Sequence, residues 1–243
     1  MKPLKKASEM SPEELGAYID QSVLKPEFTQ DEIKKYTKEG IDMFCRTVCV
    51  NPSAIDLAKE LCAGTKTDVC VVCDFPFGLS DTDSKVLQAE AICKKGDIFE
   101  IDTVSNYGWI RSGLYDKVEE DIRAVSEKCH EYGTALKVIL ETDALTEVEI
   151  VNAVDACVAA GADFVKTSTG FFTGGKSDGA CEEVIRLMLD AASNRIQVKG
   201  SGGIRTQEHF FKLIDMGIDR MGIGFKSTPT VLGISDTVSS SHY

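Results

Sequence analysis

Two lysines late in the chain end short apolar runs, Lys166 at the end of residues 164–166 and Lys199 at the end of residues 197–199. An amine is a nucleophile only in its neutral form, and an ordinary lysine is almost fully protonated near neutral pH. If the two runs are adjacent strands, the ammonium groups lie close together, and like charges disfavour the protonated forms. The pair therefore predicts a lysine that forms a Schiff base with a carbonyl compound. Taken singly, each lysine is also explained as a strand-end residue whose ammonium group reaches solvent.

A third lysine and two carboxylates occupy similar apolar surroundings. Lys137 begins the run 137–140, and Asp102 lies with Glu100 in the run 100–104. Residues two apart on a strand share a face, so we expect Glu100 and Asp102 to point toward the same side. Two roles for Asp102 stay open: a counter-ion of a buried lysine, or a group that relays a proton directly or through water.

Strand-like and helix-length segments alternate along the whole chain, and they must position these side chains. The predicted strands are residues 18–24, 43–50, 69–75, 98–104, 136–141, 163–168, 196–199 and 220–223. The predicted helical segments include residues 52–61, 84–95, 114–132, 147–160, 180–192 and 206–216. Several helices are expected to end at a glycine just before a strand, as C′ glycines do. These glycines are Gly40, Gly96, Gly133, Gly161 and Gly217.

The alternation predicts a parallel sheet in a single domain, residues 1–243, with a flexible serine-rich tail from about residue 235. A (β/α)8 TIM barrel is the simplest closure of eight strands, and a doubly wound open sheet is the alternative. In both architectures the chemistry lies at the carboxyl ends of the strands, where Lys166 and Lys199 are expected.

The composition limits the partners and the compartment. A net charge of −12 argues against a nucleic-acid or membrane-surface partner, because both are anionic. The nine cysteines are odd in number and scattered through apolar runs, which predicts buried packing residues in a reducing, cytoplasmic protein. Cys70 and Cys73 form a C-x-x-C motif, but positions three apart on a strand face opposite sides. With three widely separated histidines, we expect no metal site.

Several motifs, in order along nearly the whole chain, resemble those of the deoxyribose-phosphate aldolase family. They are Val48-Cys49-Val50-Asn51-Pro52, Phe75-Pro76-Phe77-Gly78, Glu100-Ile101-Asp102, residues 136–142, Lys166-Thr167-Ser168-Thr169-Gly170-Phe171 and Gly202-Gly203-Ile204-Arg205-Thr206. The block that starts at Lys166, combined with Lys199 just upstream of the Gly-Gly-Ile-Arg motif, is the most specific part of the resemblance.

The resemblance implies a class I aldolase on a TIM barrel that uses neither a cofactor nor a metal. Such an enzyme reversibly cleaves 2-deoxy-D-ribose 5-phosphate to acetaldehyde and glyceraldehyde 3-phosphate. By the same resemblance Lys166 forms the imine, Lys199 favours the neutral form of Lys166, and Asp102 relays protons with Lys199 and water. The implied partners are small molecules, a sugar phosphate and aldehydes. We also expect a homo-oligomer, with a dimer favoured.

The resemblance further implies where the phosphate binds, and here the sequence departs from the family. The expected contacts are backbone amides of Gly170, Gly202 and Gly203. The family commonly ends its last strand in Gly-x-Ser-Ser, whereas this chain has Gly222 and then Gly224 and Phe225 in place of the serines. Gly222 stays a candidate contact, and Lys226 is expected to compensate, because a charged partner binds phosphate more strongly than a hydroxyl. The alternative is a related Schiff-base aldolase that acts on a different or non-phosphorylated sugar.

The last residues offer a further candidate. The tail is polar and ends at Tyr243. It is either a passive terminus or a lid that brings the Tyr243 hydroxyl to the barrel mouth as a proton shuttle. Most terminal residues have no such role, which favours the first reading, but some members of the resembling family also end in a serine-rich tail that closes on a tyrosine, which adds support to the second.

A rival function belongs to another class of protein. Residues 170–177 match the P-loop pattern G-x-x-x-x-G-K-[ST] between a predicted strand and a predicted helix, so a nucleotide-binding protein is the remote alternative. Against it, no later apolar run ends in a convincing metal-binding aspartate. A non-catalytic relative of the aldolases is a third possibility, although Lys166, Lys199 and Asp102 are all present.

Overall fold

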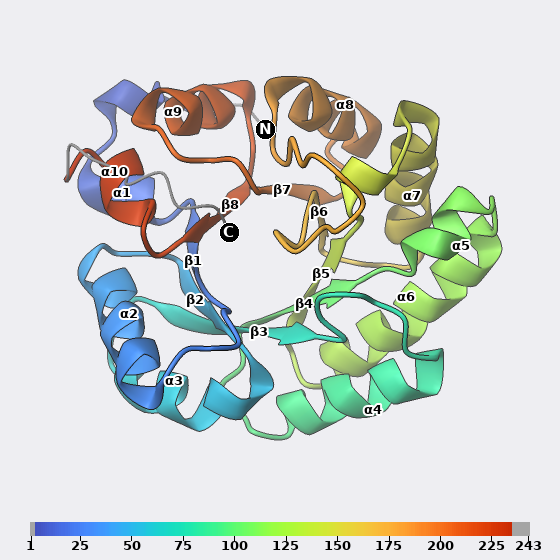
Figure 1. The fold of residues 1–243 in the computed structure, drawn as a ribbon, viewed down its shortest axis with the longest axis horizontal. Helices are drawn as coiled ribbons and strands as arrows, with labels where there is room; N and C mark the ends of the chain where they lie inside the picture. The colour runs from blue at the N-terminus through green and yellow to red at the C-terminus, as the bar shows by residue number, and fades with distance from the viewer. Residues whose placement is uncertain (1–2, 235–243) are drawn as a thin grey trace.

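Eight parallel strands close into a barrel in the computed structural model, which describes residues 3–234 (Figure 1). The strands follow one another in chain order, and β1 closes the barrel against β8 through pairs such as Asp20 with Gly222. The predicted TIM barrel is therefore confirmed, and the open doubly wound sheet is wrong. The strands are β1 Ile19–Val23, β2 Thr47–Val50, β3 Asp68–Cys73, β4 Glu100–Val104, β5 Ala135–Ile139, β6 Phe164–Lys166, β7 Gln197–Ser201 and β8 Arg220–Gly224.

Helices surround the barrel and carry the chain from one strand to the next (Figure 1). The α-helices are α1 Pro12–Gly16, α2 Gln30–Asp42, α3 Ile55–Cys62, α4 Thr82–Cys93, α5 Tyr107–Arg111, α6 Tyr115–Glu131, α7 Glu147–Ala159, α8 Glu182–Ala192, α9 Gln207–Met216 and α10 Thr228–Val231. Three 3₁₀ turns are Ala7–Glu9, Pro52–Ala54 and Thr142–Ala144. The predicted strand 43–50 is shorter than expected, because α2 continues through Asp42 and Phe44 turns the chain with a φ of 58°.

Glycines mark most of the expected helix ends. Gly96, Gly133, Gly161 and Gly217 follow helices with φ values of 71°, 71°, 76° and 100°, a region that glycine adopts without steric cost. The prediction for Gly40 is wrong, because this glycine lies inside α2. A Cβ atom there would lie 2.9 Å from Val48 Cγ1, so Gly40 allows α2 to pack closely against β2.

The barrel wall separates two apolar regions. Outward-facing strand residues join the large core beneath the helices, whereas Leu24, Cys49, Cys70 and Val72 form a separate small cluster. Cys73 belongs to the outer core, which confirms that Cys70 and Cys73 face opposite sides. All nine cysteines are free and eight are buried, as expected of packing residues.

Two further expectations concern the surface of the molecule and its end. Within residues 3–234, no helix combines the length and the apolar character needed to cross a membrane. The serine-rich tail from residue 235 and its terminal Tyr243 lie outside the described residues.

Candidate active site

The register of the barrel brings the predicted lysines together. Lys166 on β6 is paired directly with Lys199 on β7, and Asp102 on β4 is paired with Lys137 on β5. The side chains of Lys137, Lys166 and Lys199 are 0%, 4% and 1% exposed. The alternative in which these lysines reach out to solvent is therefore wrong, since all three are enclosed in the barrel.

One carboxylate joins the three lysines. Oδ2 of Asp102 lies 2.7 Å from Nζ of Lys166 and 2.8 Å from Nζ of Lys199. Oδ1 of Asp102 lies 3.0 Å from Nζ of Lys137. The sequence predicted that the ammonium groups of Lys166 and Lys199 would lie close together as like charges. In the structure both groups also contact the carboxylate of Asp102, which they share.

A second layer of ion pairs lies deeper along the same strands. Asp20 on β1 lies 2.5 Å from Nζ of Lys199 and 2.7 Å from a guanidinium nitrogen of Arg220. Glu100 binds Lys137 and lies 3.1 Å from Arg220. Glu100 and Asp102 thus point into the barrel together, as their spacing predicted. Asp20 and Arg220 were not among the candidates, because neither stands at the end of an apolar run as Lys166 and Lys199 do.

The electrostatics of this cluster follow from burial and charge count. Burial opposes the charged forms, but Asp102 and Asp20 together outweigh it and raise the pKa of Lys199. For Asp102, burial is likewise outweighed, by Lys137, Lys166 and Lys199, which lower its pKa. The cluster holds four cationic side chains against three carboxylates, so loss of one proton makes it neutral. Its cations are Lys137, Lys166, Lys199 and Arg220, and its carboxylates are Asp20, Glu100 and Asp102.

A cavity of about 490 Å³ opens at the carboxyl ends of the strands. Lys166 is the one lysine of the buried cluster that lines it. Two further cationic residues, Lys176 and Arg205, line its outer part, and none of the described residues that form its wall is acidic. The wall consists of Ser22, Leu24, Lys166, Thr169, Gly170, Phe171, Phe172, Gly175, Lys176, Ser177, Ser201, Gly202, Gly203, Ile204, Arg205, Gly222, Gly224 and Ser227.

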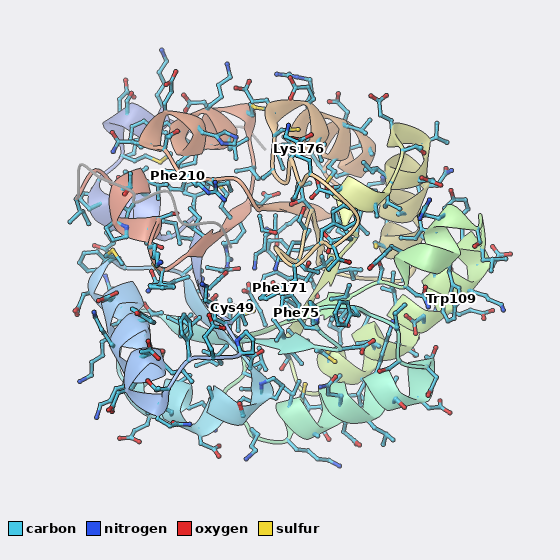
Figure 2. The ribbon with its side chains drawn as sticks, viewed as in Figure 1. Cys49, Phe75, Trp109, Phe171, Lys176 and Phe210 are labelled. Atoms are coloured by element: carbon cyan, nitrogen blue, oxygen red, sulfur yellow. The ribbon has the colours of Figure 1, made fainter. Side chains whose placement is uncertain are left out.

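Aromatic rings border the barrel mouth. Phe75, just after β3, and Phe171, in the loop after β6, meet edge to face with ring centroids 5.4 Å apart. Figure 2 shows both rings near the centre of the barrel and Lys176 farther out on the loop after β6. This contact spans two strand ends that are far apart in the sequence.

The predicted phosphate contacts divide into two groups. Gly170, Gly202, Gly203 and Gly222 all line the cavity, whereas Lys226 is exposed and lies outside its wall. Sequence reasoning missed Lys176 and Arg205, although each stands in a motif that was noted: the glycine-rich run 170–177 and the run Gly-Gly-Ile-Arg.

The substitution of the second expected serine by Phe225 has a structural explanation. The Phe225 ring is 8% exposed and lies 3.8 Å from the ring centroid of Tyr36 on α2. It also meets Phe28 edge to face at 5.3 Å. Phe225 therefore packs the end of β8 against α2 and is not part of the cavity wall.

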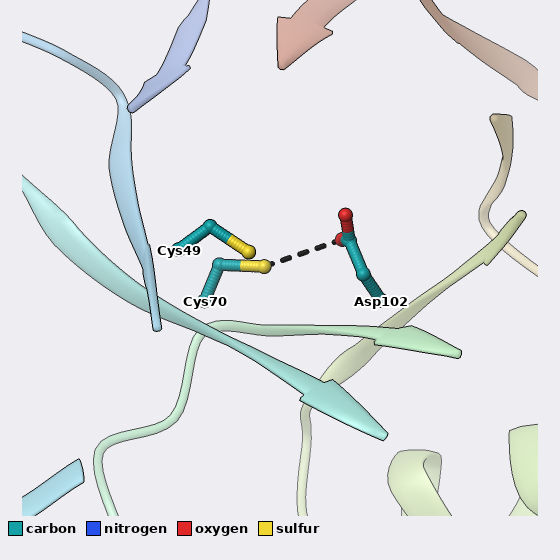
Figure 3. A group of neighbouring side chains, drawn as sticks. All are labelled: Cys49, Cys70 and Asp102. Carbon is teal, nitrogen blue, oxygen red and sulfur yellow. Dashed lines mark hydrogen bonds between the residues drawn. The ribbon is translucent and has the colours of Figure 1, made fainter. Parts of the chain in front are cut away.

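Two thiols in the barrel interior lie next to Asp102. Sγ of Cys49, Sγ of Cys70 and a carboxylate oxygen of Asp102 lie within 4.8 Å of one another (Figure 3). Cys70 donates a hydrogen bond to Asp102 at 3.2 Å, and burial raises the pKa of this thiol well above its ordinary value. The ammonium group of Lys137 lies 3.4 Å from the same sulfur. A neutral thiol beside a buried cation suits a hydrogen bond better than a metal ligand.

The P-loop alternative is wrong on geometry. A P-loop passes directly into a helix whose N-terminus faces the phosphates. Here residues 170–177 are irregular, and α8 begins only at Glu182. Lys176 is 85% exposed and lies 2.8 Å from Asp178. The loop instead forms one wall of the barrel cavity.

Comparisons with known proteins identify the family of the chain. A family model described as DeoC/LacD family aldolase matches residues 16–227. The chain is 44% identical over 213 residues to the deoxyribose-phosphate aldolase of Mannheimia succiniciproducens, which covers 88% of this chain and 92% of that protein. The solved structure of the aldolase QR15 superposes with a TM-score of 0.80 at 36% identity, covering 89% of this chain and 94% of QR15. The tetrameric deoxyribose phosphate aldolase of Aeropyrum pernix has a TM-score of 0.79 at 28% identity, with 92% and 91% covered.

Proposed function

The chain belongs to the DeoC/LacD family of aldolases, and we propose that it cleaves 2-deoxy-D-ribose 5-phosphate reversibly through a Schiff base on Lys166. The products are acetaldehyde and glyceraldehyde 3-phosphate. The names of the similar proteins support the substrate, and the enclosed lysine cluster supports the chemistry. A homo-oligomer in the cytoplasm fits the free, buried cysteines and the tetrameric relative.

The position of Lys166 carries the assignment. Lys166 lines the cavity, whereas Lys137 and Lys199 do not, so a carbonyl compound in the cavity meets this amine first. Burial disfavours the charged form of Lys199, but Asp102 and Asp20 outweigh it and raise the pKa of Lys199. Asp20 and Glu100 likewise outweigh burial and raise the pKa of Arg220. The geometry thus supports Lys166 as the nucleophile and Lys199 and Arg220 as cations that stay charged.

The proposed reaction cleaves the C2–C3 bond of the sugar through an imine on Lys166. The neutral Lys166 amine attacks C1 of the open-chain sugar, and loss of water gives a protonated imine. The C3 hydroxyl loses its proton, the C2–C3 bond breaks, and its electron pair moves into the imine to form an enamine. Glyceraldehyde 3-phosphate leaves, C2 takes up a proton, and hydrolysis of the imine releases acetaldehyde. Asp102 contacts both Lys166 and Lys199, which supports the proposal that it passes protons between them and a water molecule.

The outer cavity suits an anionic substrate. Lys176 and Arg205 line it, and the described part of its wall has no carboxylate, in a protein whose net charge is −12. We propose that the phosphate binds there, against the amides of Gly170, Gly202 and Gly203. A non-phosphorylated sugar is the alternative substrate. Comparing kcat/KM for 2-deoxyribose 5-phosphate and 2-deoxyribose separates the two, because equal values would mean that no phosphate site operates.

The covalent step is tested by trapping. Borohydride reduction in the presence of acetaldehyde should leave a two-carbon group on Lys166, identified by mass spectrometry of the peptides. Lys166→Arg should lose both the label and turnover, because a guanidinium stays protonated and cannot form an imine. A label on Lys199 or Lys137 would overturn the assignment of roles, and no label on the wild-type protein would overturn the proposed mechanism.

A further inference from the structure

One side chain after β5 accepts several hydrogen bonds from the loop after β6. Asp143 lies in the 3₁₀ turn Thr142–Ala144, and its carboxylate accepts four hydrogen bonds from the loop. Oδ1 accepts from the backbone N–H of Asp178 at 2.7 Å and of Gly179 at 3.1 Å. Oδ2 accepts from the hydroxyl of Ser177 at 2.7 Å and of Ser168 at 3.2 Å. Charged acceptors make the stronger class of hydrogen bond.

This loop forms much of the cavity wall. It contributes residues 169–172 and 175–177 to the lining. Its end also seats against the loop after β7, where the N–H of Ala180 donates to the carbonyl of Gly202 at 3.0 Å. A Cβ atom on Gly179 would lie 2.6 Å from the Gly202 backbone, so the two loops are in close contact. By holding the loop after β6, Asp143 therefore also affects the position of the loop after β7, and both loops form part of the cavity wall.

The two halves of the loop have different anchors. Glu141, just before the 3₁₀ turn, accepts hydrogen bonds from the backbone N–H of Thr169 at 3.2 Å and from its hydroxyl. Thr169 in turn accepts a bond from the N–H of Phe171 at 2.9 Å. The first half, next to Lys166, thus stays tied when Asp143 is removed. The second half, which carries Lys176, depends on Asp143.

We propose that Asp143 is a positioning residue that holds the second half of this loop, residues 174–179, and thereby sets the affinity for the phosphorylated end of the substrate. It acts through Ser177, Asp178 and Gly179 and touches no reacting atom. The proposal rests on the proposed aldolase function, because it assigns the outer cavity to the phosphate. If the loop holds its binding position in only a fraction of the molecules, the apparent affinity for the substrate falls in proportion to that fraction.

The test separates positioning from charge. Asp143→Ala should raise KM for 2-deoxyribose 5-phosphate about tenfold while kcat changes less than about twofold. The reason is that the loop would then hold its binding position in only about a tenth of the molecules. kcat/KM for 2-deoxyribose and the borohydride trapping with acetaldehyde should stay at the wild-type level. Simple removal of a negative charge beside a cationic cavity would lower KM instead. An unchanged or lower KM, or an equal loss on both sugars, would overturn the proposal.

Three matched variants sharpen the result. Asp143→Asn removes the same charge but keeps an oxygen for the amides of Asp178 and Gly179, so it should restore most of the affinity. Ser177→Ala, which removes one of the four bonds, should give an intermediate KM and serves if the alanine variant fails to fold. Glu147→Gln removes an exposed acid at the start of α7 and should leave KM unchanged.

A measurement without substrate keeps this proposal distinct from the proposed function. Hydrogen exchange of the Asp178 and Gly179 amides should be faster in Asp143→Ala than in the wild type, while the exchange of Phe171 should not change. This outcome would hold even if no aldolase activity were found. Equal exchange in both proteins would overturn the positioning role by itself.

Discussion

At the scale of single residues, the central fact is that Asp102 is the common partner of three ammonium groups. Its two oxygens contact Lys137, Lys166 and Lys199, and it is fully buried. Both roles left open by the sequence are compatible with this position, because a counter-ion that touches two neighbouring lysines is also placed to move a proton between them.

Replacing the Asp102 charge distinguishes these two roles. Asp102→Asn leaves four cations against two carboxylates, and breaking a buried ion pair in this way costs about 3–5 kcal/mol of unfolding free energy. We also expect slower exchange of the C2 protons of acetaldehyde, measured by NMR in deuterium oxide. The matched control is Asp121→Asn, which breaks the buried pair with Lys85 outside the barrel and should lower stability without slowing exchange. A normal exchange rate in Asp102→Asn would show that Asp102 acts only as a counter-ion.

The cationic residues of the outer cavity give a second residue-scale prediction. Arg205→Ala should raise KM for 2-deoxyribose 5-phosphate by about tenfold, because a hydrogen bond to a charged group contributes about 1.5–3 kcal/mol. Lys226→Ala tests the candidate expected from the sequence, and its exposed position outside the cavity wall predicts a smaller rise. Steady-state kinetics on the phosphorylated and free sugars provide the comparison. A larger effect at Lys226 than at Arg205 would reverse the assignment.

At the scale of elements, the end of β8 shows how packing can replace a ligand-binding residue. Phe225, where the family commonly has a serine, lies with Phe28 and Tyr36 between β8 and α2. Its neighbour Gly224 stays in the cavity wall, where it offers only backbone. The cationic side chains that line the cavity outside the buried cluster are Lys176 and Arg205, on the loops after β6 and β7.

Restoring the serine should therefore harm the fold without improving binding. Phe225→Ser removes a buried ring, and we expect a loss of about 3 kcal/mol in the free energy of unfolding, measured with urea. KM for the phosphorylated sugar should not fall, because this side chain points into the aromatic cluster. Phe225→Leu, which keeps much of the volume, should lose less stability. A clear fall in KM for the serine variant would show that position 225 reaches the phosphate.

At the scale of the whole molecule, charge is distributed unevenly. The protein has a net charge of −12, yet its buried cluster contains one more cation than carboxylate and the described part of its cavity wall is cationic. Such a concave cationic region attracts an anion locally even on an acidic protein. The same cluster joins β1, β4, β5, β6, β7 and β8, so its ionisation is coupled to the closure of the barrel.

This coupling predicts how stability depends on pH. Burial raises the pKa of Asp20, but Arg220 and the lysines of the cluster outweigh this effect. At Asp102 the lysines likewise outweigh burial. The pKa of each carboxyl therefore lies below its ordinary value of 3.8. Their contribution is present above pH 3.8 and is lost as the pH falls below it. The pKa values of Lys137 and Lys199 are raised, so their contribution persists through neutral pH and is lost only above their ordinary value of 10.5.

The acid limb of this profile is the measurable part. Below about pH 4, the two carboxyls together should lower the unfolding free energy by up to about 3 kcal/mol per pH unit, since each bound proton contributes about 1.36 kcal/mol. Urea unfolding at several pH values gives the slope. Asp20→Asn should reduce this contribution by about half. A slope that is the same in the variant would show that Asp20 does not titrate with folding.

Local patterns were sufficient to predict a parallel sheet and the lysine cluster. Alternating strand and helix segments indicate such a sheet, for which a barrel is the simplest closure, and a charged residue at an apolar strand end stands out because burial of a charge is costly. These rules depend only on neighbouring residues, so Lys166, Lys199 and Asp102 were found without the structure. The helix-ending glycines followed from the same kind of local signal, except that Gly40 is set by its contact with Val48.

What the sequence could not determine is which side chains from distant strands share one partner. Lys199 is bound to Asp20 across 179 positions, and only closure of β8 against β1 brings Arg220 to the same carboxylate. Likewise, Arg205 and Lys176 come from different loops to line one cavity, and Asp143 meets Ser177 only after β5 and β6 are paired. Contacts of this kind depend on the register and closure of the barrel, which are properties of the whole chain and leave no local pattern to recognise.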